Sequence, residues 1–96
     1  MFVVIFKAKL LNVDQPYYDT AQALRKRAFE FGCYHFESYN ESGREITLSY
    51  WPDRDSINRW GQDSEHTKAQ ARGMAEWYAE HSVEIAELET SNRFIK

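Results

Sequence analysis

The sequence predicts an α+β domain of the ferredoxin-like class, with elements in the order β-α-β-β-α-β. Two observations lead to this prediction: stretches of period-two alternation near both ends and in the middle of the chain, and helical spacing of apolar residues between them. Ninety-six residues are the size of one domain, so residues 1–96 are expected to form a single unit. Short hairpins and right-handed crossovers then give an antiparallel sheet with helices on one face.

The first half of the order comes from one strand and one long helix. Residues 2–10, FVVIFKAKL, alternate along the chain as a strand does. From Tyr17 to Phe31, apolar residues recur at spacings of four and three, which predicts one buried helix stripe. Pro16 suits a first helical turn, and Gly32 stands where a left-handed cap is favoured.

The second half begins with a hairpin. Residues 33–51 alternate on both sides of Glu41-Ser42-Gly43, which predicts two strands joined by a tight turn. Ile57 and Trp60 then indicate a short helix that Gly61 interrupts.

A second helical segment and a last strand complete the order. Asp63 or Ser64 can cap this helix, which runs through Ala69 towards Trp77. Ala69 and Gly73 are expected to allow close packing of helix on sheet. Residues 82–88, SVEIAEL, are predicted to form the last strand.

The helices can cover only one face of this sheet, yet neither set of strand side chains is polar throughout. On the first strand, Val3 and Ile5 lie on the face opposite to that of Phe2 and Phe6. In the hairpin, one face of the second strand carries the apolar residues Ile46, Leu48 and Tyr50. An open apolar face is unfavourable on a monomer. Pairing two sheets would remove it from water at roughly 25 cal/mol per Å² of apolar surface, so a homodimer is expected.

Composition excludes several classes of function. Twelve basic against 15 acidic residues give a formal charge of −3, which argues against nucleic-acid binding. The apolar start MFVVIF is too short for a signal peptide or a membrane span, so no membrane association and a cytoplasmic location are expected. The lone Cys33 fits a reducing compartment. Cys33 and His35 share a spacing of two, but without two further ligands a zinc site is not expected.

The run SYWPDRDSINRWGQDSEHTKAQARGMAEWY, residues 49–78, resembles the antibiotic biosynthesis monooxygenase family, in particular its small stand-alone dimeric α+β barrels. The family has an aromatic pair ending the third strand, a Trp in the following helix, an Asp-x-x-His helix start and a Trp-Tyr pair before the last strand. The matching residues here are Tyr50, Trp51, Trp60, Asp63, His66, Trp77 and Tyr78.

The resemblance implies a cavity between sheet and helices in a homodimeric barrel. Better known members bind a polycyclic phenol, a quinol or haem there, and use oxygen without flavin or metal when the substrate supplies the electrons. A small aromatic ligand and no cofactor are therefore expected. The protein then has to exclude water, hold the ring and remove one proton, for which a neutral imidazole is suited.

His66 is accordingly the candidate catalytic base, although a structural hydrogen bond is the commoner role of such a histidine. Asp63 could accept from backbone amides or orient the imidazole. The candidate substrate-binding residues can all be explained by packing as well. They are Trp60, Tyr50, Trp51, Arg72, Trp77 and Tyr78.

Two alternatives stay open. The haem-degrading branch of the family uses an Asn on strand one and a His about a turn beyond His66, where this chain has Phe6 and Lys7, and Gln70. Glutamine is a poor iron ligand beside imidazole, so haem degradation is the less favoured enzyme hypothesis. The same barrel could also serve as a non-catalytic module that binds a small ligand.

Overall fold

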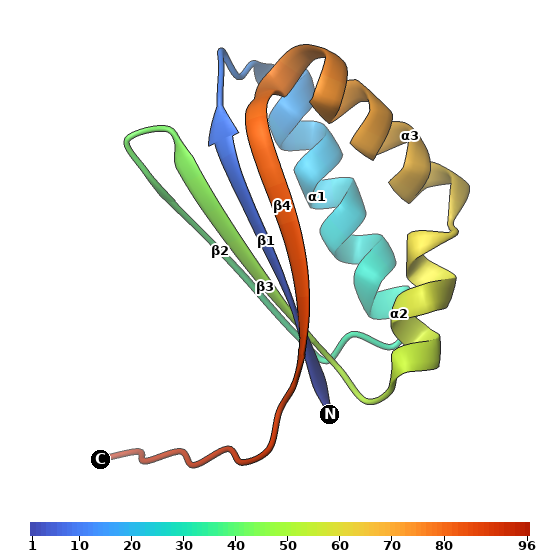
Figure 1. Ribbon diagram of the computed structural model, residues 1–96, viewed down its shortest axis with the longest axis vertical. Coiled ribbons are helices and arrows are strands. Elements are labelled where there is room, and N and C mark those ends of the chain that lie inside the picture. The colour runs from blue at the N-terminus through green and yellow to red at the C-terminus, as the bar shows by residue number, and fades with distance from the viewer.

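The computed structural model describes residues 1–96 and confirms the α+β, ferredoxin-like architecture (Figure 1). One antiparallel sheet has the order β2-β3-β1-β4, and the helices cover one of its faces. The strands are β1 (Phe2–Leu10), β2 (His35–Glu41), β3 (Arg44–Trp51) and β4 (Tyr78–Glu87). The helices are α1 (Gln15–Glu30), α2 (Arg54–Gly61) and α3 (Ser64–Arg72), and a π-helical turn (Gly73–Trp77) follows α3.

Central strand β1 sets which side chains face the helices. It pairs with β3 on one side and β4 on the other, with Val4 opposite Ser49 and Ile85. Val4 and Ser49 are buried beneath the helices. Because side chains alternate along a strand, every second residue of β1 and β3 from these positions lies on the helix side.

Three residues with positive φ provide the tight turns that the sequence predicts. Gly32 has φ 113° after α1, in the region that favours glycine at a helix end. Ser42 and Gly43, at φ 52° and 79°, form the two-residue hairpin loop between β2 and β3. Positive φ at both central residues matches the twist of the flanking strands.

An aspartate caps each helix at its N-terminus. Asp14, Asp53 and Asp63 each accept a hydrogen bond from a backbone N–H three residues later, over 2.8–3.3 Å. These bonds satisfy donors that the first helical turn cannot pair internally. The predicted cap at Asp63 is confirmed.

Asp63 also links α3 to α1. Its carboxylate accepts from Nε of Arg27 at 3.2 Å and forms an ion pair with the same guanidinium. The sequence places Arg27 in a run of three cations that is typical of a solvated helix face. Instead, this side chain ties two helices together over a carboxylate that is only 7% exposed.

The last strand begins earlier than the sequence indicates. β4 starts at Tyr78, which pairs with Leu10 across an irregularity in the register. The backbone N–H of Leu11 donates to the carbonyl of Trp77 at 2.8 Å. Because of these pairings the strand begins four residues before the predicted start at Ser82, and Tyr78 becomes part of the sheet.

The core centres on Trp51, which is fully buried at the end of β3. Its indole Nε1 donates to Oγ of Ser49 at 2.9 Å, so the ring is buried without an unpaired polar atom. Val4, Ala28, Cys33 and Ile57 complete the cluster around it.

The other face of the sheet has no helix over it. By register, Val3, Ile5, Ile46, Leu48 and Tyr50 share this open face across β1 and β3. Ile46 is 41% exposed.

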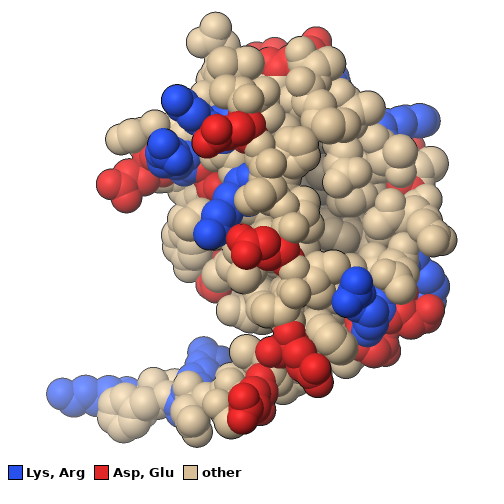
Figure 2. Space-filling model, viewed as in Figure 1, with Lys and Arg blue, Asp and Glu red and all other residues tan.

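On the side of the molecule seen in Figure 2, acidic and basic side chains are intermixed and form no broad field of one sign. No helix has the length and apolarity needed to cross a membrane.

Two glycines make a matched pair for testing helix-to-sheet packing. A Cβ on Gly73 would overlap the ring of Tyr78, whereas a Cβ on Gly61 meets nothing within 4 Å. We expect Gly73→Ala to lower the free energy of unfolding by about 1–3 kcal/mol, as overpacking does. Gly61→Ala should raise it by about 0.5–1 kcal/mol, because alanine is favoured in a helix. Urea denaturation measures both, and equal effects would contradict this account of Gly73.

Candidate functional site

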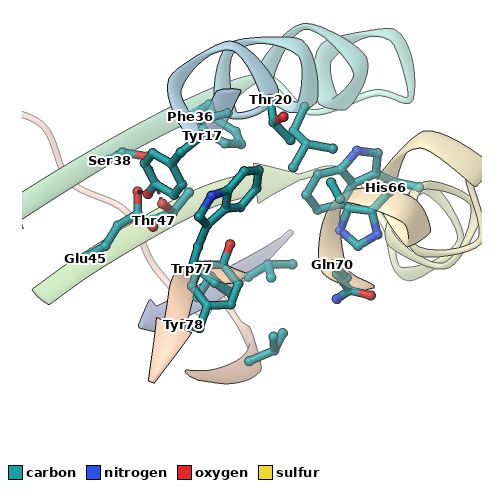
Figure 3. Close-up of a pocket in the computed structure, with 17 residues that line it drawn as sticks. Tyr17, Thr20, Phe36, Ser38, Glu45, Thr47, His66, Gln70, Trp77 and Tyr78 are labelled. Atoms are coloured by element: carbon teal, nitrogen blue, oxygen red, sulfur yellow. Dashed lines mark hydrogen bonds between the residues drawn. The ribbon is translucent and has the colours of Figure 1, made fainter. Parts of the chain in front are cut away.

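A cavity of about 130 Å³ lies between the sheet and helices α1 and α3 (Figure 3). An apolar cavity of roughly 150 Å³ is known to hold benzene, so this space matches a single aromatic ring. Eleven of its 17 lining residues are hydrophobic. The predicted cavity between sheet and helices is therefore present within a single chain.

Four of the seven predicted site residues line this cavity. His66 lies at one end, with the ring of Trp60 against its imidazole, while Trp77 and Tyr78 flank the middle. They come from α3, α2, the π-helical turn and β4, so elements distant in sequence converge on one space.

The other three predicted residues lie outside the lining. Trp51 sits in the core beneath the cavity, and the guanidinium of Arg72 lies 4.9 Å from the ring centroid of Trp77. Both support residues that do line the cavity. Tyr50 is on the open face, where its ring lies 5.3 Å from that of His35.

His66 ends a stack of three rings. Its imidazole lies 4.2 Å from the indole of Trp60, which lies 5.1 Å from that of Trp51, measured between centroids. Nδ1 of His66 and Nε1 of Trp60 are buried and have no hydrogen-bond partner. An unpaired buried polar atom costs about 1–3 kcal/mol, so both rings are buried at an energetic cost that core packing has to offset.

Burial lowers the pKa of His66 below 6.5, and the Gly61 backbone and the charge of Asp63 only partly oppose this. The imidazole is thus neutral at pH 7 and can accept a proton. Asp63 does not contact the imidazole, because its carboxylate is engaged by the backbone N–H of His66 and by Arg27. Asp63 therefore positions the helix on which His66 lies.

The opposite end of the cavity is polar (Figure 3). The hydroxyl of Tyr17 donates to Oε1 of Glu45 at 2.6 Å, and the hydroxyls of Ser38 and Thr47 are 2.8 Å apart. Burial raises the pKa of Glu45, although the hydrogen bond from Tyr17 opposes this. Burial, with a contribution from Glu45, raises the pKa of Tyr78 to about 12.

The motifs of the sequence do not identify this polar end. Because side chains alternate along a strand, Glu45 lies on the same face as Thr47, Ser49 and Trp51. A carboxylate on this inward-facing side of the strand is the sequence signal that could have identified Glu45 as a site residue. Tyr17 is predicted only as part of a helix stripe.

Neither zinc nor haem fits the residues present. Cys33 is buried and donates to the carbonyl of His35 at 3.1 Å, while the His35 side chain is 58% exposed. No group of three or more His, Cys, Asp or Glu is placed to hold a metal. A cavity of single-ring volume is too small for a tetrapyrrole, and Gln70, not an imidazole, lines it one turn after His66.

Solved structures define the class of fold. One, described as "Putative antibiotic biosynthesis monooxygenase from Nitrosomonas europaea", superposes with a TM-score of 0.79 at 9% identity, covering 94% of this chain and 100% of that one. A second so described, from Caulobacter crescentus CB15, has a TM-score of 0.74 at 16% identity, covering 93% and 90%. The chain has the fold of the antibiotic biosynthesis monooxygenases.

Sequence comparison then gives the family. No family model matches the chain. It is 34% identical over 95 residues to YqjZ of Bacillus subtilis (strain 168), an uncharacterized protein, covering 97% of this chain and 83% of YqjZ. The chain belongs to the same family as YqjZ.

The pKa of His66 can be tested through its effect on stability. The folded protein binds a proton at His66 less readily than the unfolded chain, so stability should fall as the pH drops below 6.5. We expect His66→Gln to reduce the loss of melting temperature between pH 7 and pH 5. Titration of the imidazole by NMR should give a pKa below 6.5, and a value above 6.5 would contradict this account of its burial.

Proposed function

We propose that this protein is a cofactor-independent monooxygenase whose substrate is a monocyclic phenol of the hydroquinone type. The observation that carries the proposal is the neutral, half-buried His66 at the end of a cavity of single-ring volume. The likeness of the fold to proteins described as antibiotic biosynthesis monooxygenases supports it.

The cavity supplies the three things such a reaction needs from the protein. The rings of Phe36, Trp60 and Trp77 can hold an aromatic substrate, and the apolar walls limit water. His66 takes the proton from the substrate hydroxyl as general base. A phenolate is a much better electron donor than a phenol, so proton removal prepares the ring for reaction with oxygen.

The reaction balances without a further reductant. One hydroquinone and one O₂ give one hydroxy-benzoquinone and one water. A ring carbon forms a bond to one oxygen atom, the O–O bond breaks, and the second oxygen atom leaves as water. The substrate supplies all four electrons, and the two hydrogen atoms of the water come from the substrate as well.

We also propose that the protein acts as a cytoplasmic homodimer, formed by two sheets packed through their open faces. Ile46 is 41% exposed there, beside Leu48 and Ile5 on neighbouring positions of β3 and β1. Burying such a contiguous apolar surface favours association. The free, buried thiol of Cys33 suits a reducing compartment.

His66→Ala tests the catalytic assignment. A general base contributes about 10² to 10⁴ in rate, so kcat/KM for hydroquinone should fall by that factor, with little change in melting temperature. An oxygen electrode measures turnover above autoxidation, and the uptake should be one O₂ per hydroquinone without hydrogen peroxide. His81→Ala is the matched control, because His81 is exposed on β4 and does not line the cavity.

The result also separates enzyme from binding module. If the wild-type protein binds hydroquinone but consumes no oxygen, the non-catalytic alternative replaces the oxygenase proposal. If His66→Ala keeps full turnover, His66 is not the base.

A pair of lysine substitutions tests the dimer. Ile46 and Ile85 are exposed to similar extents, 41% and 38%, but lie on opposite faces of the sheet. We expect Ile46→Lys to produce monomers, because two buried lysines would face each other across the interface. Ile85→Lys should leave the dimer intact. Light scattering gives the mass of each, and a monomeric wild type would contradict the proposal.

A further inference from the structure

We infer that the polar end of the cavity, formed by Glu45, Tyr17, Ser38 and Thr47, is a subsite that recognises a second hydroxyl group on the aromatic ligand. The inference rests on the proposed function in that a phenolic ring occupies the cavity. It adds a specificity-determining residue, Glu45, to the site and gives the second hydroxyl of a hydroquinone-type ligand its partner.

The geometry leaves Glu45 one free acceptor. Its Oε1 accepts from the hydroxyl of Tyr17, and its Oε2 has no hydrogen-bond partner within the protein. Glu45 is half-buried and lines the cavity. A carboxylate oxygen in this position can accept from a ligand hydroxyl.

The surrounding groups define this end as an acceptor. Tyr17 is buried, and burial together with the neighbouring Glu45 raises the pKa of its hydroxyl, which therefore remains a donor committed to Glu45. Ser38 and Thr47 hydrogen-bond to each other. Tyr17 occupies only Oε1 of Glu45, so Oε2 remains available to accept a hydrogen bond from a ligand.

The two ends of the cavity require the same chemistry of a ligand. Figure 3 shows Glu45 and Thr47 gathered at one end and His66 at the other, with Trp77 and Tyr78 between them. Glu45 and the neutral His66 both accept, so a ring with a hydroxyl at each end satisfies both. A ring with one hydroxyl leaves a polar group without a partner, which weakens binding.

Anaerobic binding tests the subsite without requiring turnover. Trp60 and Trp77 line the cavity, so quenching of their fluorescence reports a bound ring. Hydroquinone is compared with 4-fluorophenol, which is similar in shape but lacks the second donor. We expect the wild-type protein to prefer hydroquinone by about tenfold or more, as one hydrogen bond to a charged group allows.

Substitution of Glu45 should remove that preference. Glu45→Gln keeps the shape but weakens the acceptor, and Glu45→Leu removes it, so the preference should fall below about threefold in both. Glu41→Gln on exposed β2 is the matched control and should keep it. Melting curves show that each variant is folded.

An unchanged preference in both Glu45 variants, or equal binding of the two ligands by the wild type, overturns the inference. A Glu45-dependent preference without oxygen uptake supports the subsite while the oxygenase proposal fails. Oxygen uptake with no effect of Glu45 on ligand preference supports the oxygenase proposal and overturns the subsite.

Discussion

The stack of Trp51, Trp60 and His66 is the interaction on which the site depends. Trp51 is fully buried and hydrogen-bonded to Ser49, so it fixes the position of the indole of Trp60 above it. Trp60 in turn covers one side of the imidazole of His66. The burial that lowers the pKa of His66 is therefore a consequence of core packing at the end of β3.

The cavity lies between two contacts that join α1 to the segment formed by α3 and the π-helical turn. Arg27 and Asp63 tie α1 to α3, while the rings of Tyr17 and Trp77 meet edge-on with centroids 5.3 Å apart. Between these contacts no side chain fills the space, and the walls carry a neutral base at one end and a carboxylate at the other. Helix α3 thus contributes both to the contact that joins the helices, through its cap Asp63, and to the chemistry of the cavity, through His66.

The sequence predicts the elements well because they depend on local patterns. Gly32 and Gly43 adopt the positive φ expected of them, and Asp63 caps its helix. Within the site, motif resemblance identifies Trp60 and His66 but does not place Tyr50, whose face depends on strand parity. Glu45 and Tyr17 come together only through tertiary packing, over 28 residues, which local patterns do not encode.

A crystal structure of the protein with hydroquinone, prepared without oxygen, tests the central claim most directly. The account predicts one ring within the cavity, with a hydroxyl oxygen about 2.6–3.2 Å from a ring nitrogen of His66, the distance that proton transfer to a base requires. A ring bound outside the cavity, or bound inside it with no hydroxyl within reach of His66, would contradict the account.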